Sequence, residues 1–144
     1  MKKPVNQMKL TVPSRSVNEA FVRGAVAMFA ASLDPTCDLL ADVKTAVSEA
    51  VTNCIVHAYP DSIGLIYITA SLDADGCLTV RIRDRGRGIA DVRKAMEPLF
   101  TTGGDDRSGM GFTIMESFMD TLKVRSASGR GTTVVMQRRI RSKR

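Results

Sequence analysis

Glu49 and Asn53 are the first pair of residues in this chain whose types and spacing could do chemistry. They are four residues apart, so on a helix they stack along one edge, near Thr52. A carboxylate in this position can accept a proton or orient a nucleophile, and a carboxamide oxygen can bind a hard cation such as Mg²⁺. For one such pair in isolation a solvated helix face is the competing interpretation, so the neighbouring residues have to decide.

Two Gly-x-Gly sequences suggest a second kind of chemistry, the close approach of backbone to a ligand. Gly86 and Gly88 follow Asp84, while Gly109 and Gly111 stand at the start of a predicted helix. Neither pair continues to the third glycine of a dinucleotide fingerprint, and the chain has no Gly-Lys pair for a P-loop. Both standard phosphate-binding motifs are therefore excluded.

The two glycine turns make sense together with the polar helix edge. The Asp84 carboxylate can accept a hydrogen bond from an exocyclic amine such as that of adenine. A helix start exposes N–H groups that attract an anion, and Arg107 adds a positive charge beside it. Each turn in isolation could be a plain turn or loop. Together with Glu49 and Asn53 they predict one ATP site, with Mg²⁺ bound at Asn53.

Apolar periodicity predicts the first elements that must position these residues. A strand is expected at 8–12, before Pro13, and a helix is expected to begin at Ser16, which has the spacing of a capping box with Glu19. The apolar stripe of this helix is predicted to consist of Phe21, Ala25, Met28 and Phe29. Thr36 is the predicted cap of a long helix that runs to about residue 57.

The second half of the chain alternates strands with shorter helices. Strands are predicted at 66–72 and 78–82, then a short helix at 90–97, a loop at 99–109, and a hairpin at 122–139 that turns at 128–131. Between the loop and the hairpin, a helix at 110–120 is expected to bury Ile114, Met115 and Phe118. This order predicts an α+β fold, a two-layer sandwich of a mostly antiparallel sheet with helices on one face.

Composition limits the class of protein. The 144 residues, with 44% hydrophobic and 25% charged residues, indicate a single globular domain at 1–144. The net charge of +6 is concentrated in a basic tail at 138–144, for which solvation is favoured over nucleic-acid binding. The three cysteines suggest a reducing compartment. Neither a signal peptide nor a membrane-spanning run is predicted, so we expect a cytoplasmic protein.

Three stretches of the chain carry a resemblance to a known group of proteins. "SEAVTNCIVHAY", "DRGRGI" and "RSGMGFTIME" resemble the N, G1 and G2 boxes of the GHKL ATPase/kinase superfamily, which includes histidine kinases, Hsp90, gyrase B and MutL. With "LDPT" and "PLFTT" added, the chain resembles the sporulation anti-sigma factors of spore-forming bacteria, which are serine kinases. The resemblance covers almost the whole chain.

The resemblance implies a role for each matching residue. Glu49 matches the catalytic carboxylate and Asn53 the Mg²⁺ ligand. Asp84 matches the residue that recognises the adenine amine, and Gly86 and Gly88 shape that pocket. The remaining nucleotide-binding positions are the ATP lid and a threonine below the adenine, namely Thr101, Thr102, Arg107, Ser108, Gly109, Met110, Gly111 and Thr132.

The resemblance also implies partners. Arg23 matches an arginine that contacts both a sigma factor and an anti-anti-sigma factor, although by itself it would be taken for a solvated side chain. The implied protein is a homodimer that binds ATP or ADP and Mg²⁺, inhibits a sporulation sigma factor and phosphorylates a serine of its anti-anti-sigma factor. The lid sequence "GGDD" and Ala58, where many relatives have glycine, depart from the pattern.

Three other functions remain open at this point. A histidine-kinase catalytic domain would need a phosphoacceptor helix pair, for which only about fifteen residues precede the first helix. A non-catalytic, ATP-dependent module could sequester a sigma factor without transferring phosphate. A basic nucleic-acid binder would show steeply salt-dependent affinity for DNA, but direct contact with nucleic acid or membrane is not expected.

Overall fold

Five strands, each with apolar residues at alternate positions, form one antiparallel sheet in the order β1-β2-β3-β5-β4. The computed structural model describes residues 3–97 and 111–140. The strands are β1 (Pro4–Pro13), β2 (Leu65–Asp73), β3 (Cys77–Asp84), β4 (Thr121–Ala127) and β5 (Gly131–Arg139). The predicted antiparallel sheet is confirmed, and each predicted strand is present with somewhat different ends.

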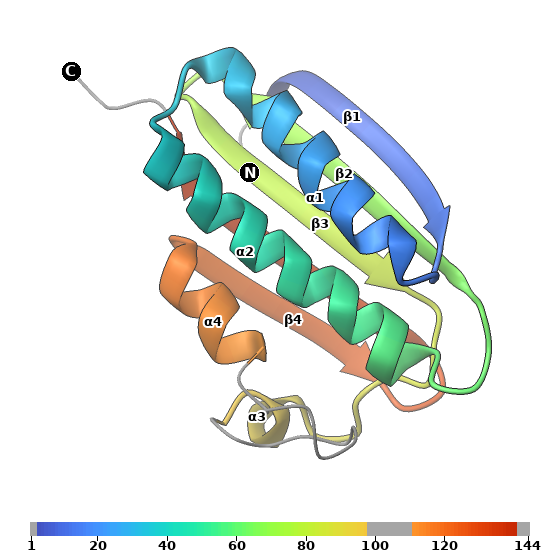
Figure 1. The fold of residues 1–144 in the computed structure, drawn as a ribbon. Coiled ribbons are helices and arrows are strands. Elements are labelled where there is room, and N and C mark those ends of the chain that lie inside the picture. Colours follow the sequence, from blue (N-terminus) through green and yellow to red (C-terminus); the bar gives the residue numbers. More distant parts are fainter. Residues whose placement is uncertain (1–2, 98–110, 141–144) are drawn as a thin grey trace.

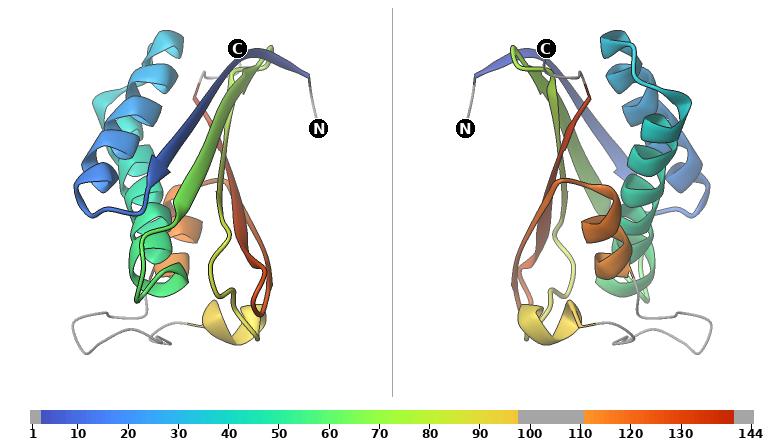
Figure 2. Two further views of the ribbon diagram at one scale, coloured as in Figure 1. Left: turned by 90° about the vertical axis from the view of Figure 1, so that its right-hand side faces the viewer. Right: turned by 90° about the vertical axis from the view of Figure 1, so that its left-hand side faces the viewer.

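The larger helices cover one face of this sheet, which gives the predicted two-layer sandwich (Figures 1 and 2). The helical elements are α1 (Val17–Ala30), the 3-10 turn η1 (Ala31–Leu33), α2 (Cys37–Asn53), the π-helical turn η2 (Cys54–Ala58), α3 (Val92–Ala95) and α4 (Gly111–Phe118). α2 packs between α1 and α4, and α3 lies at one end of the sheet (Figure 1). In the described part of the chain no helix is long and apolar enough to cross a membrane.

The core fills the space between the helix layer and the inner face of the sheet. β2 and β3 contribute every second residue, which the pleat places on one face. The fully buried large side chains are Ile66, Ile68, Leu78, Ile82, Met115, Met136, Val22, Val26, Val43, Val47, Val51 and Val80. At the start of α2, Thr36 accepts a hydrogen bond from the Leu39 N–H at 3.1 Å, so its predicted role as a cap is confirmed.

Two predictions for α1 are wrong. Its buried stripe consists of Val22, Val26, Ala27 and Ala30, whereas Phe21 and Met28 are exposed. The helix has two apolar stripes, and periodicity alone does not reveal which of them faces the sheet. The side chain of Ser16 makes no capping hydrogen bond. The Glu19 carboxylate does not complete a capping box but pairs with Arg23 instead.

The basic tail begins later than the sequence suggested. β5 continues to Arg139, and the following Ile140 is buried against the core. The Arg138 guanidinium lies 3.4 Å from the Asp42 carboxylate and 3.9 Å from that of Asp120. Residues 138–140 therefore belong to the sheet and the core, and residues 141–144 lie outside the described part of the chain.

Candidate functional site

Asp84, the last residue of β3, is a buried carboxylate with three hydrogen-bond donors. Its Oδ1 accepts hydrogen bonds from the backbone N–H groups of Gly86 at 2.9 Å and Thr132 at 3.2 Å. Its Oδ2 accepts one from the Cys54 thiol at 3.5 Å. Only 5% of Asp84 is exposed. Burial raises the pKa of this carboxyl above its ordinary value, and the three hydrogen bonds act in the opposite direction.

The two glycines after Asp84 let this turn pass between other backbone segments. A Cβ atom on Gly86 would lie 2.3 Å from the carbonyl oxygen of Ala58, and one on Gly88 would lie 2.0 Å from that of Ala127. Gly88 also has a φ of +73°, which L-residues rarely adopt. Close backbone packing therefore requires glycine here, while the approach of this turn to a ligand stays a prediction. Ala58, the noted departure from the family pattern, contacts Gly86 directly.

The hairpin of β4 and β5 supports the same turn through hydroxyl groups. Ser126 Oγ accepts a hydrogen bond from the Ile89 N–H at 2.7 Å and lies 2.8 Å from Thr132 Oγ1. The Thr132 backbone also binds Asp84, so one residue of β5 connects the hairpin to the carboxylate. Thr132 is among the predicted site residues, whereas Ser126 is not, because a serine in a strand carries no signal that it faces a turn 37 residues away.

Glu49 and Asn53 lie beside the start of α4. A Cβ atom on Gly111 would come within 3.3 Å of both terminal atoms of the Asn53 amide and within 3.4 Å of Glu49 Oε2. Both side chains are half-buried on α2. The carboxylate, the carboxamide and the helix start that the sequence assigned to one site are thus adjacent. Residues 3–97 and 111–140 contain no group of three or more His, Cys, Asp or Glu side chains that could hold a metal ion.

The long helix widens at its end instead of continuing as an α-helix. α2 ends at Asn53, and the π-turn from Cys54 to Ala58 is closed by a hydrogen bond of 3.2 Å from the Tyr59 N–H to the Cys54 carbonyl. The predicted extent of this helix, from Thr36 to about residue 57, is confirmed, and its last turn is π-helical, which apolar spacing does not distinguish from an α-helical turn. π-turns are frequent at functional sites, and this one directly follows Asn53.

The remaining predicted site residues are Arg23 and the residues of the predicted lid. Arg23 lies on α1, where its guanidinium is 3.0 Å from the Glu19 carboxylate and partly exposed. The predicted lid residues lie outside the described part of the chain, except for Gly111; they are Thr101, Thr102, Arg107, Ser108, Gly109 and Met110.

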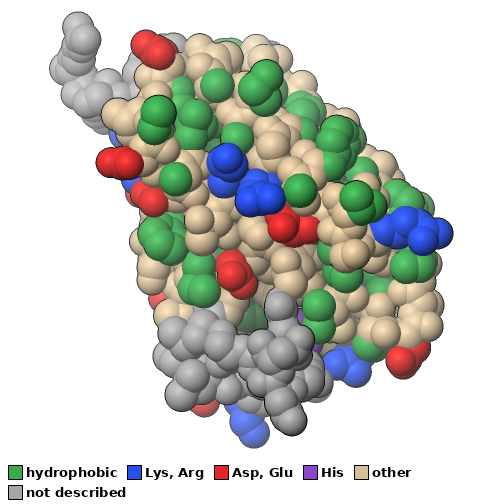
Figure 3. All heavy atoms as spheres, in the orientation of Figure 1, with side chains coloured by type: hydrophobic (Ala, Val, Ile, Leu, Met, Phe, Trp, Pro, Cys, Tyr) green, Lys and Arg blue, Asp and Glu red, His purple; other side chains and the backbone are tan. Residues whose placement is uncertain are grey.

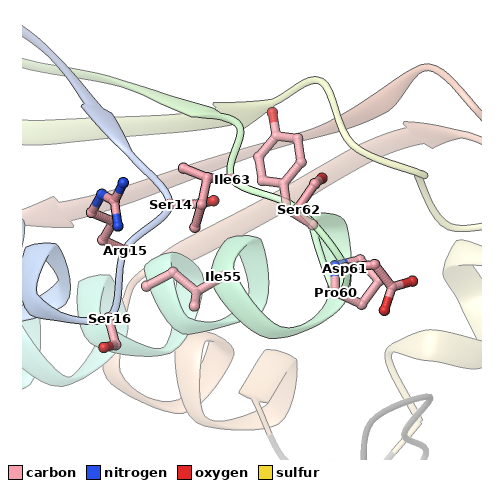
Figure 4. Close-up of a pocket in the computed structure, with 9 residues that line it drawn as sticks. Ser14, Arg15, Ser16, Ile55, Pro60, Asp61, Ser62 and Ile63 are labelled. Atoms are coloured by element: carbon pink, nitrogen blue, oxygen red, sulfur yellow. The ribbon is translucent and has the colours of Figure 1, made fainter.

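A surface hollow of about 510 Å³ is lined by residues that differ from the site residues described above. Its walls come from the connection between β1 and α1, from η2, and from the segment before β2 (Figure 4). Tyr59, one lining residue, donates a hydrogen bond to the Leu65 carbonyl at 2.8 Å and accepts one from the Arg85 N–H at 2.6 Å. None of the residues predicted for the site lines this hollow.

One family model and several known proteins are similar to this chain over most of its length. Residues 12–138 match the family model described as histidine kinase-like ATPase domain. The chain is 55% identical over 136 residues to an anti-sigma F factor of Caldanaerobacter subterraneus subsp. tengcongensis, with 94% of each chain covered. It is 50% identical over 135 residues to that of Clostridium acetobutylicum, covering 93% of this chain and 94% of the relative.

Solved structures agree on the fold. A crystal structure of the RsbU and RsbW domains of a Mycobacterium tuberculosis protein matches with a TM-score of 0.69 at 22% identity, covering 95% of this chain and 33% of that one. A blue-light activated histidine kinase domain from Erythrobacter litoralis matches with a TM-score of 0.58 at 21% identity, covering 85% of this chain and 61% of that one. The chain therefore belongs to the histidine kinase-like ATPase family and, within it, to the anti-sigma F factors.

Proposed function

We propose that this protein binds Mg-ATP, transfers the γ-phosphoryl group to a serine of an anti-anti-sigma factor, and binds and inhibits a sporulation sigma factor, sigma F. One observation supports it above the others: Glu49 and Asn53 lie against the start of α4, while the next residue, Cys54, binds the buried Asp84. Three distant stretches of sequence thus lie close together, and to their side chains we assign base binding, phosphate binding and acid–base chemistry.

The base would bind at Asp84. Its Oδ1 is occupied by two backbone N–H groups, so Oδ2 is the oxygen that would accept the exocyclic amine of adenine. Gly86 and Gly88 have no side chains, so the turn that would lie below the base takes up little space. From β5, the Thr132 N–H donates a hydrogen bond to the carboxylate. The buried position makes a hydrogen bond to this carboxylate stronger than one made in water.

The phosphates would bind at the start of α4. Gly111 opens that helix, where exposed N–H groups favour anions. The side-chain oxygen of Asn53 is a hard donor suited to Mg²⁺, and Gly111 leaves beside it space that a side chain would fill. When bound, the ion would neutralise charge on the phosphate oxygens. By resemblance, Arg107, Ser108, Gly109 and Met110 would complete the phosphate contacts and Thr101 and Thr102 would belong to the lid.

Glu49 would accept the proton of the attacking serine hydroxyl, or orient that hydroxyl. Positioning and charge neutralisation supply most of the acceleration in phosphoryl transfer, and a well-placed base typically contributes about 10²–10⁴-fold. The position of Glu49, one helical turn before Asn53 and against α4, suits that role.

Protein partners would bind at α1. Val17, Phe21 and Met28 recur along one side of this helix and are 73%, 56% and 78% exposed. In the helix-layer view, hydrophobic side chains gather over the region where α1 lies (Figure 3). Arg23 on the same helix is partly exposed. We assign this surface to the homodimer contact and to recognition of the sigma factor and the anti-anti-sigma factor.

The function is tested by replacing Glu49→Gln and measuring ATP affinity and phosphotransfer separately. Transfer to the anti-anti-sigma factor should fall about 10²–10⁴-fold, while ATP affinity changes little because Glu49 acts on the hydroxyl and not on the nucleotide. Glu116→Gln, an exposed carboxylate on α4, is the matched control and should leave both unchanged.

The measurements separate the proposal from its alternatives. If the wild-type protein binds ATP and the sigma factor but produces no phosphoserine, it is a non-catalytic sequestering module. Undiminished transfer by the Glu49→Gln variant would remove Glu49 from catalysis. A protein that ignores ATP, with magnesium present and the fold intact, would contradict the proposal altogether.

A further inference from the structure

Cys54 donates a side-chain hydrogen bond to Asp84, and the proposed function leaves this cysteine without a role. It is 4% exposed, it is the first residue of the π-turn, and its thiol lies 3.5 Å from Asp84 Oδ2. No disulfide competes for it, since the cysteine is free. Its thiol therefore donates to Oδ2, the same oxygen that we propose as the acceptor for the adenine amine.

Of the two carboxylate oxygens of Asp84, Oδ2 is the one whose orientation depends on the Cys54 thiol. Gly86 and Thr132 fix Oδ1 through two backbone N–H groups that no side-chain substitution removes. The donor to Oδ2, in contrast, is a side chain. A carboxylate oxygen accepts in two directions, so the thiol can occupy one of them and leave the other open.

The chemistry of a thiol suits such a position. It is a weak donor, so it orients Oδ2 without competing strongly with a second donor. Cys54 is buried and lies beside the Asp84 carboxylate, and both conditions disfavour a thiolate, so the group acts as a neutral S–H donor.

We infer that Cys54 is a positioning residue for Asp84, and that it helps the site to select a purine with an amine at C6 over one with a carbonyl. The inference rests on the proposed function, because it takes Asp84 as the base-binding residue. A base with an amine donates to Oδ2, whereas a base with an oxygen there places two acceptors in contact. By keeping Oδ2 oriented, the thiol strengthens the hydrogen bond from the amine. It also keeps Oδ2 in a position where a carbonyl at C6 would meet it unfavourably.

The experiment compares ATP with inosine triphosphate, which carries a carbonyl at C6, on the full chain with Cys54→Ala. The affinity for ATP should fall about 3- to 30-fold, which is the low end of the effect expected when a hydrogen bond to a charged group is lost. The affinity for inosine triphosphate should stay nearly constant. Cys54→Ser keeps a donor and should restore the preference for ATP. Cys77→Ala makes the same substitution at the start of β3, the far end of the strand, and should behave as wild type.

A pH series supplies a readout that a merely structural role would not move. Losing a donor to the ionised carboxylate raises the pKa of Asp84 further, so ATP affinity of the Cys54→Ala variant should begin to fall at a higher pH than in wild type. Other groups near Asp84 are Tyr59, whose pKa is raised mainly by burial, and the exposed Arg85. His57 on η2 is present in every variant, so the difference between variants reports Asp84.

The outcomes separate the two proposals. If wild type prefers ATP and Cys54→Ala matches it in affinity, selectivity and pH profile, the inference about Cys54 is overturned and the ATP site stands. If wild type shows no preference for ATP, the role of Asp84 fails and the inference fails with it. Should Cys54→Ala fold poorly, the S–H stretching band of Cys54 decides in wild-type protein: it must shift when ATP binds, and an unchanged band contradicts the inference.

Discussion

At the scale of single residues, Asp84 shows how a binding group can oppose the stability of its own fold. Its carboxyl is buried and its pKa is raised, so ionisation at neutral pH is unfavourable relative to the unfolded chain. Three donors reduce that penalty, and all of them stabilise the charged form. A perturbed, buried carboxylate of this kind is a candidate for a functional group, which agrees with the role that we propose for Asp84.

The substitution Asp84→Asn should separate binding from stability. The Asn side chain can keep one oxygen for Gly86 and Thr132 but places an NH₂ group where the adenine amine would donate. ATP affinity should therefore fall about 10- to 100-fold, as for loss of a hydrogen bond to a charged group. The urea unfolding midpoint at pH 7 should not fall, because the variant no longer buries a charge.

The pH dependence of that comparison has a definite sign. Between its unfolded and its raised folded pKa, Asp84 binds more protons in the folded protein, so its contribution to the free energy of unfolding decreases as pH rises. The stability advantage of the Asp84→Asn variant should therefore shrink as pH falls through the folded pKa. An advantage that grows on acidification would contradict the assignment of a raised pKa.

At the scale of elements, the site depends on thin turns and close helix ends. The Gly86–Gly88 turn passes between η2 and the β4–β5 hairpin, and Gly111 brings α4 against the polar edge of α2. The π-turn η2 then provides both the thiol beside Asp84 and the carbonyl of Ala58 that accepts a hydrogen bond from the Arg87 N–H. The Gly86 and Gly88 contacts and the Ala58–Arg87 hydrogen bond involve backbone, whereas the Cys54–Asp84 hydrogen bond joins two side chains.

Two glycine substitutions should distinguish backbone strain from close packing. Gly88 and Gly129 both have positive φ, +73° and +77°, but only Gly88 has a neighbour within 4 Å of a built Cβ. Gly129→Ala should cost about 1–2 kcal/mol of unfolding free energy from strain. Gly88→Ala adds a clash with the Ala127 carbonyl, so about 2–5 kcal/mol is expected, together with weaker ATP binding.

Chemical denaturation and ATP titration of the two variants check this prediction. Equal destabilisation would mean that the hairpin moves away from Gly88 at no cost. Normal ATP affinity in a folded Gly88→Ala variant would show that the turn does not need to lie where the structure places it.

At the scale of the whole molecule, two surfaces differ in character. On the helix side, α1 exposes the apolar side chains Val17, Phe21 and Met28. On the outer side of the sheet, strand register places exposed cations in adjacent rows; they are Lys9, Arg81, Arg83, Lys123 and Arg125. An exposed apolar stripe on a folded domain indicates a protein contact, which is why we assign the homodimer contact to α1.

The double substitution Phe21→Glu and Met28→Glu should convert the proposed homodimer to a monomer. Both side chains are exposed, so the fold should tolerate the change, while two buried charges at a contact between copies strongly oppose association. Sedimentation velocity measures the outcome. Lys123→Glu introduces the same carboxylate on β4, an edge strand of the sheet that lies apart from the α1 stripe. This control variant should remain dimeric. A dimer that survives the double substitution does not use this stripe.

Much of this protein could be predicted from sequence because the information is local. Alternating apolar residues gave the strands, Thr36 gave the start of α2, and both glycine pairs and the Glu49–Asn53 spacing gave the motifs. The antiparallel two-layer fold followed from the order of these elements and is confirmed. Local signals suffice where backbone geometry or side-chain periodicity is set by neighbours along the chain.

Only the tertiary structure decided which of two apolar stripes on α1 is buried, where α2 widens into a π-turn, and that Cys54 meets Asp84. It also moved Arg138 from a predicted tail into ion pairs with Asp42 and Asp120. These features depend on contacts between residues that are distant in sequence. Periodicity describes one element at a time, whereas packing against another element selects the face, the turn and the hydrogen-bond partner.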